Sequence, residues 1–516
     1  MTASATPDIG LGNLILRRGQ LTPRRRALTF EEQTLSFAQL SDRVRRLATS
    51  LRQGGVCRGD RVGYIGFNHP AFLETLFATS CLGAIFVPLN FRLSGPEIRY
   101  IANDAGLHTL VVDNTMQTTI ESEQETLCAR RYISAEPDAS TPEGWDLLEA
   151  LIAASDPLLD CERTESHDVA IIMYTSGTTG LPKGAMLTQG NIFWNTVNAC
   201  FGEEYMGQST LTCAPLFHIG GLNVTTLQSL CKGVEVVLHR NFDAAKVLED
   251  IPRYQVAAIF GAPTMFLMMS QEATFAETDL SSIRSLICGG APVPVPLIEL
   301  YGQRGVQFNQ GYGLTETAPF SSLLNADMAL EKVGSAGTAP LFTFVRIVDD
   351  NNRPLPAGEV GEVCVMGPNV MKGYWNRPQA TAEAIDAEGW FHSGDMGYLD
   401  EDGYLFLCDR LKDMVISGGE NVYPAEVESV LYGHEAIREV AVIGLPDSKW
   451  GEAVSAIVVL EQGAELSLAQ LRDFGEQNLA RYKLPTQLHF IDALPRNPAG
   501  KVLKYELRES FTSKEG

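Results

Sequence analysis

The stretch MYTSGTTGLPKGAML, from Met173 to Leu187, is the most informative part of the chain. It combines three glycines, a series of hydroxyl side chains and a single lysine within a few residues. The apolar run before it, HDVAIIMY, is typical of a strand, and the sequence after it, LTQGNIFWNTVNAC, has the apolar spacing of a helix. We therefore expect a loop that joins a strand to a helix, with backbone N–H groups facing an anion.

This loop is not a P-loop. A P-loop ends in Gly-Lys-Ser/Thr, whereas Lys183 is followed here by Gly184. Gly177 and Gly180 nevertheless permit the backbone angles of an anion-binding nest. The hydroxyl donors that suit a polyphosphate are Thr175, Ser176, Thr178 and Thr179. The alternative, a surface loop rich in Gly, Ser and Thr, does not explain the Pro-Lys-Gly ending, so the residues favour phosphate binding.

The composition is that of a large globular protein. The chain has 516 residues, 45% of them hydrophobic and 20% charged, which corresponds to about three or four structural units. The net charge of −23, from 40 basic and 63 acidic residues, argues against nucleic acid and against anionic membrane surfaces as partners. A nucleotide site in such a chain must build its positive field locally.

The ten cysteines are scattered and form no CxxC pair. This pattern indicates neither a zinc site nor a disulfide framework, and it suits reduced thiols in the cytoplasm. The N-terminus has no signal-peptide pattern, and no apolar run approaches the roughly 18–20 residues of a membrane helix. We expect a cytoplasmic protein with no membrane span.

Strand and helix patterns alternate from about Leu28 to Val112 and again after the glycine-rich loop, which predicts α/β layers with mainly parallel sheet. From about Gly334, short strands and turns predict a β-rich subdomain. A compact helix–strand–strand pattern follows residues 410–413. The predicted fold is α/β: a large N-terminal domain with layered sheets and a β-rich subdomain (1–409), a hinge (410–413) and a small mobile α+β domain (414–516).

Several motifs together resemble the signatures of the adenylate-forming superfamily, which includes acyl-CoA synthetases, aryl-CoA ligases, luciferases and adenylation domains of peptide synthetases. Besides YTSGTTGLPKG, they are GYGLTETAP (Gly311–Pro319), GWFHSGDMGYLDEDGYL (Gly389–Leu405), DRLKDMVISGGENVYPAEVE (Asp409–Glu428) and PRNPAGKVLK (Pro495–Lys504). They occur in the family's order, and the resemblance covers about residues 28 to 508.

The resemblance implies an AMP-forming acid–CoA ligase. A fatty or aryl acid would react with ATP and Mg²⁺ to give acyl-AMP and pyrophosphate, and CoA would then displace AMP as the thioester. A stand-alone enzyme that loads a carrier protein is the alternative, and CoA-dependent release of AMP separates the two. A nucleotide-binding module without catalysis is disfavoured because Lys501, Glu316 and Asp395 are all present.

The nucleotide site follows from the motifs residue by residue. Tyr312 can stack on adenine, Thr315 can bond the α-phosphate and Glu316 can hold Mg²⁺, although a Thr-Glu pair alone also suits the start of a helix. Asp395 offers two acceptor oxygens to the ribose diol, with a turn aspartate as the alternative. The expected ATP/AMP-binding residues are Thr175, Ser176, Gly177, Thr178, Thr179, Gly180, Lys183, Gly289, Gly290, Ala291, Gln310, Gly311, Tyr312, Gly313, Thr315, Asp395 and Arg410.

Three residues are expected to be catalytic: Lys501, His218 and Thr315. A point charge at Lys501 would orient the carboxylate and stabilise the charge on the α-phosphate. His218, by resemblance, stands between the acid and the phosphates, whereas by itself it reads as a core histidine. Lys412 would be the hinge, and Gly418 and Gly419 would flank the pantetheine arm of CoA.

The motifs do not specify which carboxylic acid is the substrate. The stretches expected to line its tail, Gly220–Asn223, Gly261–Thr264 and Thr317–Phe320, contain no lysine or arginine. A neutral-tailed acid is therefore expected over a dicarboxylate or an amino acid. Fatty and hydroxycinnamoyl tails both remain open. LDEDGYL (Leu399–Leu405) is predicted to be a hairpin turn with no chemistry.

Overall fold

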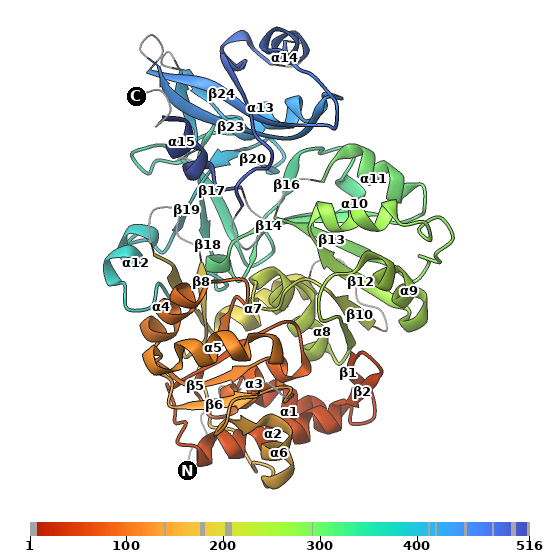
Figure 1. Cartoon of the computed structure of the whole chain (residues 1–516), viewed down its shortest axis with the longest axis vertical. Coiled ribbons are helices and arrows are strands. Elements are labelled where there is room, and N and C mark those ends of the chain that lie inside the picture. The colour runs from red at the N-terminus through yellow and green to blue at the C-terminus, as the bar shows by residue number, and fades with distance from the viewer. Residues whose placement is uncertain are drawn as a thin grey trace. The chain divides into compact units, whose positions relative to one another are not determined.

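The structure is a computed structural model (Figure 1). It describes residues 8–138, 141–175, 181–201, 209–290, 293–410, 413–417, 420–447, 451–476, 479–496 and 502–512. The chain forms two compact units: residues 1–345 with 365–391, and residues 346–364 with 392–516. The expected α/β class is confirmed, and the hinge at 410–413 stays a prediction. Among the described helices, none has the length and apolar character needed to cross a membrane.

An eight-stranded sheet in the first unit carries the expected nucleotide motifs on strands β13 and β14. Its order is β15-β14-β13-β12-β10-β11-β1-β2, and the inner neighbours from β14 to β1 pair in parallel. The strands are β1 (Arg26–Phe30), β2 (Gln33–Ser36), β10 (Ser209–Thr212), β11 (Glu235–Leu238), β12 (Val256–Gly261), β13 (Ser285–Gly289), β14 (Phe308–Gly313) and β15 (Phe320–Leu324).

A seven-stranded sheet, also in the first unit, has the order β7-β6-β5-β3-β4-β8-β9. It is parallel except for the β8–β9 edge. Its strands are β3 (Arg61–Ile65), β4 (Ile85–Leu89), β5 (Leu107–Val112), β6 (Arg131–Ser134), β7 (Asp146–Leu147), β8 (Val169–Thr175) and β9 (Lys183–Thr188). Buried apolar runs such as IFVPL in β4 explain why these strands form the interior of a covered parallel sheet.

Helices cover both sheets of the first unit. Helix α2 begins with a capping box, in which the Ser36 hydroxyl accepts from the Gln39 N–H and the Gln39 side chain accepts from the Ser36 N–H. The helices of this unit are α1 (Leu11–Leu21), α2 (Phe37–Gln53), α3 (Pro70–Cys81), α4 (Gly95–Ala105), α5 (Gln117–Glu123), α6 (Leu148–Ala154), α7 (Gln189–Cys200), α8 (Leu227–Lys232), α9 (Ala244–Tyr254), α10 (Pro263–Gln271), α11 (Val295–Gly302) and α12 (Pro378–Ala384).

An N-terminal hairpin forms the outer end of the eight-stranded sheet. Strand β1 pairs in parallel with β11, and β2 then pairs antiparallel with β1. Glu235 of β11 is only 3% exposed. Its carboxylate accepts from the Thr29 hydroxyl at 2.6 Å and pairs with the Arg26 guanidinium at 3.0 Å. The hairpin therefore neutralises a buried charge as well as covering an edge.

The second unit contains a run of neighbouring strands, β20-β19-β18-β17, in which β19 and β20 are antiparallel, and a smaller sheet, β22-β21-β24-β23, with β25 beside β24. The predicted hairpin turn at LDEDGYL is confirmed, because Leu399 and Leu405 pair where β19 ends and β20 begins. The elements are β17 (Phe344–Val348), β18 (Gly361–Met366), β19 (Phe391–Leu399), β20 (Leu405–Arg410), β21 (Val415–Ser417), β22 (Glu420–Val422), α13 (Pro424–Leu431), β23 (Ile437–Asp447), β24 (Gly451–Leu460), α14 (Leu468–Gly475), β25 (Gln487–Phe490) and α15 (Lys504–Thr512).

Candidate active site

The glycine-rich loop leaves the end of β8 and returns on β9, not on a helix. Thr175 and Lys183 are paired residues of these antiparallel strands, and helix α7 begins only at Gln189. The expected strand-to-helix connection is therefore wrong. The reason is that residues 183–188 pair with β8 before the helical pattern starts. The residues between the strands, Ser176, Gly177, Thr178, Thr179 and Gly180, lie outside the described residues.

Polar contacts fix both stems of this loop. On the incoming strand, the Tyr174 hydroxyl donates to the Asp104 carboxylate at 2.7 Å. Burial, and after it this hydrogen bond, raises the pKa of the phenol. On the outgoing side, the Tyr100 hydroxyl donates to the Pro182 carbonyl at 3.3 Å. The Arg377 guanidinium closes the group by donating to Asp104 at 2.6 Å and to the Tyr100 oxygen at 3.1 Å. Helix α4 and the residue just before α12 thus hold the two ends of the loop in place.

Lys183 and Glu316 are brought together through a tyrosine that sequence reasoning missed. The backbone of β9 pairs with residues 372–375, with Ala185 opposite Tyr374. The Lys183 ammonium lies 5.3 Å from the centre of the Tyr374 ring, a cation–π distance. The Tyr374 hydroxyl donates to the Glu316 carboxylate at 2.9 Å. One aromatic side chain therefore links the phosphate-loop lysine to the expected metal ligand.

Glu316 fits a magnesium ligand by its chemistry. It belongs to the short 3₁₀ turn Thr315–Thr317 and is 8% exposed, and its carbonyl accepts from the Met371 N–H at 2.7 Å. A carboxylate held in this way by backbone and tyrosine is the hard oxygen ligand that Mg²⁺ prefers. Thr315, in the same turn, is half-buried.

Glycines from the expected ATP/AMP-binding set lie at the carboxyl ends of β13 and β14, where they leave the backbone uncovered by side chains. Gly289 and Gly311 are paired residues of the two parallel strands, and Gly290 has a φ of +86°, which favours glycine. The Gln310 side chain accepts from the Val293 N–H at 3.2 Å and so orders the end of the intervening loop. Tyr312 and Gly313 follow on β14 and are at least partly accessible. Ala291 lies outside the described residues.

His218 is half-buried in an aromatic group formed with Phe217 and Phe91. Its ring centre lies 4.5 Å from that of Phe217. Burial, and secondarily the charge of Arg92, lowers the pKa of the imidazole to about 4, so the ring is neutral at pH 7. A π-helical turn, Gly221–Thr226, follows directly. Such turns are frequent at functional sites.

Asparagines on one face of α7 hold the surrounding segments in place. Asn191 donates to the carbonyls of residues 368 and 370, at 2.8 and 2.7 Å. Asn195 donates to the Asn223 carbonyl at 3.0 Å and accepts from the Phe320 N–H at 3.4 Å. Asn198 accepts from the N–H of residue 342 at 3.0 Å. The spacing of four and then three residues was a readable signal of one buried polar helix face.

In the second unit, the structure brings Asp395 and Arg410 to paired positions of β19 and β20. Asp395 is 8% exposed, and its N–H donates to the Ser393 hydroxyl at 3.0 Å. That hydroxyl in turn donates to the Val363 carbonyl at 2.6 Å, so the HSGD segment of β19 (residues 392–395) is fixed by its neighbours. The remaining expected residues of this unit, Lys412, Gly418, Gly419 and Lys501, lie outside the described residues.

Two family models match the chain in succession: the AMP-binding enzyme model over residues 16–375 and the AMP-binding enzyme C-terminal domain model over residues 426–501. The chain belongs to the AMP-binding enzyme family. The predicted superfamily resemblance is thereby confirmed.

Named relatives agree with this assignment. A feruloyl-CoA synthase of Amycolatopsis sp. is 45% identical over 97% of this chain and 99% of its own length. An indoleacetate–CoA ligase of Aromatoleum aromaticum is 41% identical, with 98% of each chain covered. The o-succinylbenzoate-CoA synthetase of Bacillus subtilis, solved with its acyl-adenylate intermediate, superimposes with a TM-score of 0.86 at 35% identity and covers 96% of this chain and 98% of its own. The same synthetase has been solved with ATP and a magnesium ion.

The expected chemistry is confirmed at this level. The chain is an AMP-forming acid–CoA ligase that uses ATP, Mg²⁺ and CoA with a small-molecule acid. The relatives do not indicate an enzyme that loads a carrier protein. The roles of the individual site residues stay predictions.

Proposed function

We propose that the enzyme activates an aromatic carboxylic acid with an uncharged tail, of the hydroxycinnamate or arylacetate class, in preference to a long-chain fatty acid. The observation that carries the proposal is the position of the Phe260 ring on β12. A Cβ added at Gly220 would lie 2.6 Å from this ring, and one added at Gly289 would lie 3.1 Å from it. The ring therefore occupies the space directly over Gly220 of an expected acid-binding segment and over Gly289 of the expected nucleotide site.

An aromatic wall of this kind favours a flat ring as its neighbour. Stacked or edge-on aromatic pairs contribute about 0.5–1.5 kcal/mol beyond their buried area. Phe260 itself packs against an apolar cluster of Val224, Ile287 and Phe320, so it has little freedom to swing aside for a long chain. The identities of the feruloyl-CoA and indoleacetate relatives support the same class.

The proposed first step is attack of the acid's carboxylate oxygen on the α-phosphorus of ATP. The bond from this phosphorus to the bridging oxygen breaks, and pyrophosphate leaves with the electron pair. Lys183 faces the phosphates from β9, and Lys501 stabilises the charge on the α-phosphate. Glu316 would hold Mg²⁺, and the bound ion would neutralise part of the charge on the phosphates. The neutral His218 separates acid and phosphates without attracting the carboxylate away from phosphorus.

In the proposed second step, the CoA thiol loses its proton to solvent, its sulfur attacks the acyl carbon, and AMP leaves with the electron pair of the acyl–oxygen bond. Lys501 and the Gly418–Gly419 segment both belong to the small C-terminal domain, and each has to serve a different step. We therefore include in the proposal that this domain rotates about Lys412 between the steps. A cytoplasmic location belongs to the proposal too, because the described cysteines are free thiols.

The test is a pyrophosphate-release screen with ferulate, indoleacetate, fatty acids of several lengths and malonate. Aryl acids are expected to give the highest kcat/KM. Phe260→Ala is expected to shift preference toward fatty acids by about tenfold, since a lost aromatic contact of about 1 kcal/mol and the opened space act in the same direction. Phe275→Ala, a core aromatic substitution elsewhere in the first unit, is the control for general loss of packing. Preference of the wild-type enzyme for long fatty acids or malonate would refute the proposal.

A further inference from the structure

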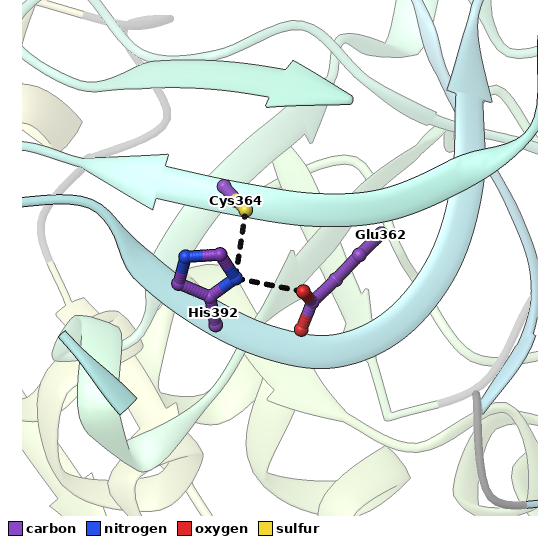
Figure 2. A group of neighbouring side chains, drawn as sticks. All are labelled: Glu362, Cys364 and His392. Carbon is purple, nitrogen blue, oxygen red and sulfur yellow. Dashed lines mark hydrogen bonds and ion pairs between the residues drawn. The ribbon is translucent and has the colours of Figure 1, made fainter. Parts of the chain in front are cut away.

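Three side chains of different chemistry converge between β18 and β19 in the second unit (Figure 2). Glu362 and Cys364 are two residues apart on β18, so both side chains lie on one face of the strand. His392 comes from the start of β19. The histidine Nδ1 lies 2.7 Å from Glu362 Oε2 and 3.4 Å from Cys364 Sγ. The three potential ligand atoms lie within 4.8 Å of one another.

Hydrogen bonding alone explains this arrangement poorly. Nδ1 carries at most one hydrogen, yet both a carboxylate oxygen and a sulfur are directed at it. The orientation of the Glu362 carboxylate is fixed, because its Oε1 accepts from the Gly394 N–H at 3.0 Å. The group is also not a nucleophile–base–acid relay, since such a relay uses the two ring nitrogens of histidine for different partners.

We propose that Glu362, Cys364 and His392 form a binding site for a thiophilic divalent cation of the Zn²⁺ type, with water as the fourth ligand. In tetrahedral Zn²⁺ sites the metal–ligand distances are about 2.0–2.1 Å to N and O and about 2.3 Å to S. These values place N and O about 3.3 Å apart and N and S about 3.6 Å apart. The Nδ1–Sγ distance already fits, and the Nδ1–Oε2 distance needs to open by roughly 0.6 Å. Binding releases the proton of the Cys364 thiol to solvent, and His392 binds through Nδ1 as the neutral imidazole with its ring hydrogen on Nε2.

The chemistry of the site separates this cation from the magnesium of the ATP reaction. A thiolate and an imidazole select borderline-soft ions, whereas Mg²⁺ prefers oxygen ligands in octahedral geometry. The cation can enter from the side of His392 and Glu362, whose side chains are 21% and 22% exposed. Cys364, at 0% exposed, forms the floor. The absence of a CxxC pair hid this site from the sequence, because its ligands are separated by 28 residues and meet only through strand pairing.

The location gives the site a regulatory consequence. His392 and Gly394 belong to the same HSGD segment of β19 as Asp395, and the Gly394 N–H donates to Glu362. A cation on Glu362 and His392 would therefore fix the part of β19 that carries the expected ribose-binding carboxylate. It is the only group of three such ligands among the residues that the structure describes.

The test is a Co²⁺ titration of the metal-free, full-length protein without acid, ATP or CoA. A thiolate-to-cobalt charge-transfer band that saturates at one equivalent, and that Zn²⁺ abolishes by displacement, is the expected result. Cys364→Ser should remove the band, and Glu362→Gln and His392→Gln should each weaken Co²⁺ binding at least about tenfold. Cys213→Ser, which alters a buried thiol of the first unit, should leave the band unchanged.

Absence of the band in the wild-type protein, or its persistence in Cys364→Ser, would overturn the proposal. Thermal unfolding of each variant checks that it is folded. If Cys364→Ser does not fold, the weaker Co²⁺ binding expected for His392→Gln tests the site by itself. Because no substrate is present, the outcome is independent of which acid the enzyme activates.

Discussion

Tyr374→Phe isolates one hydrogen bond of the candidate active site. The substitution removes only the hydroxyl that donates to the Glu316 carboxylate at 2.9 Å and keeps the ring beneath the Lys183 ammonium. A hydrogen bond to a charged group is worth about 1.5–3 kcal/mol, which corresponds to about a tenfold to 150-fold change in rate. The Met371 N–H still holds the Glu316 backbone, so the lower part of this range applies. We expect adenylation to fall about 10- to 40-fold, within the range for other groups that orient metal ligands.

The assay is pyrophosphate release as a function of Mg²⁺ concentration. If Tyr374 orients a magnesium ligand, high Mg²⁺ should recover much of the lost rate in Tyr374→Phe. Tyr301→Phe is the matched control, because the Tyr301 hydroxyl donates to a carbonyl at 2.8 Å within a buried core. The control should lose about 1 kcal/mol of stability but keep its activity. Unchanged adenylation in Tyr374→Phe, or an equal loss in both variants, would refute the assignment.

Four further outcomes are expected. Lys501→Ala should lose adenylation by orders of magnitude yet keep thioester formation from supplied acyl-AMP; loss of both half-reactions in a folded variant would exclude its role. Lys412→Pro and Gly419→Leu should show the opposite split, sparing acyl-AMP formation, because the first restricts the hinge and the second fills the CoA path; equal loss of both half-reactions would contradict domain alternation. The pKa of His218 is about 4 in the folded protein and about 6.5 in the unfolded chain, so the unfolded chain binds the proton first as the pH falls. Between pH 7 and pH 5 the wild type should therefore lose about 2 kcal/mol more stability than His218→Phe does, as measured by urea unfolding. Gly313→Ala should destabilise the protein by about 1–3 kcal/mol in thermal unfolding, because the new Cβ would lie 1.8 Å from the Pro319 carbonyl oxygen.

The fold class was predictable because periodicity and turn residues record it locally. Strand runs such as those of β4 and β12, and the LDEDGYL turn, need no distant partner to be recognised. The glycine-rich loop shows the limit of such reasoning. Residues 183–188 carry no strong strand signal, and their pairing with β8 decides their conformation.

Site residues that belong to a sequence motif could be predicted. Site residues that reach the site only through tertiary packing could not. Glu316 could be named from its motif, whereas Tyr374 reaches it only because residues 372–375 pair with β9. Phe260 is one of many strand phenylalanines until the structure places its ring over Gly220 and Gly289. Contacts between residues far apart in sequence were the missing information in both cases.

The N-terminal hairpin determines where the chain can be shortened. Removing residues up to the end of β2 would expose the edge of β11, a buried apolar strand, and leave its backbone groups on that side unpaired. It would also leave Glu235 without Arg26 and Thr29. An exposed apolar edge is a template for intermolecular pairing. Shortened forms that begin after Ser36 should therefore precipitate on expression, even though every residue of the candidate active site is retained.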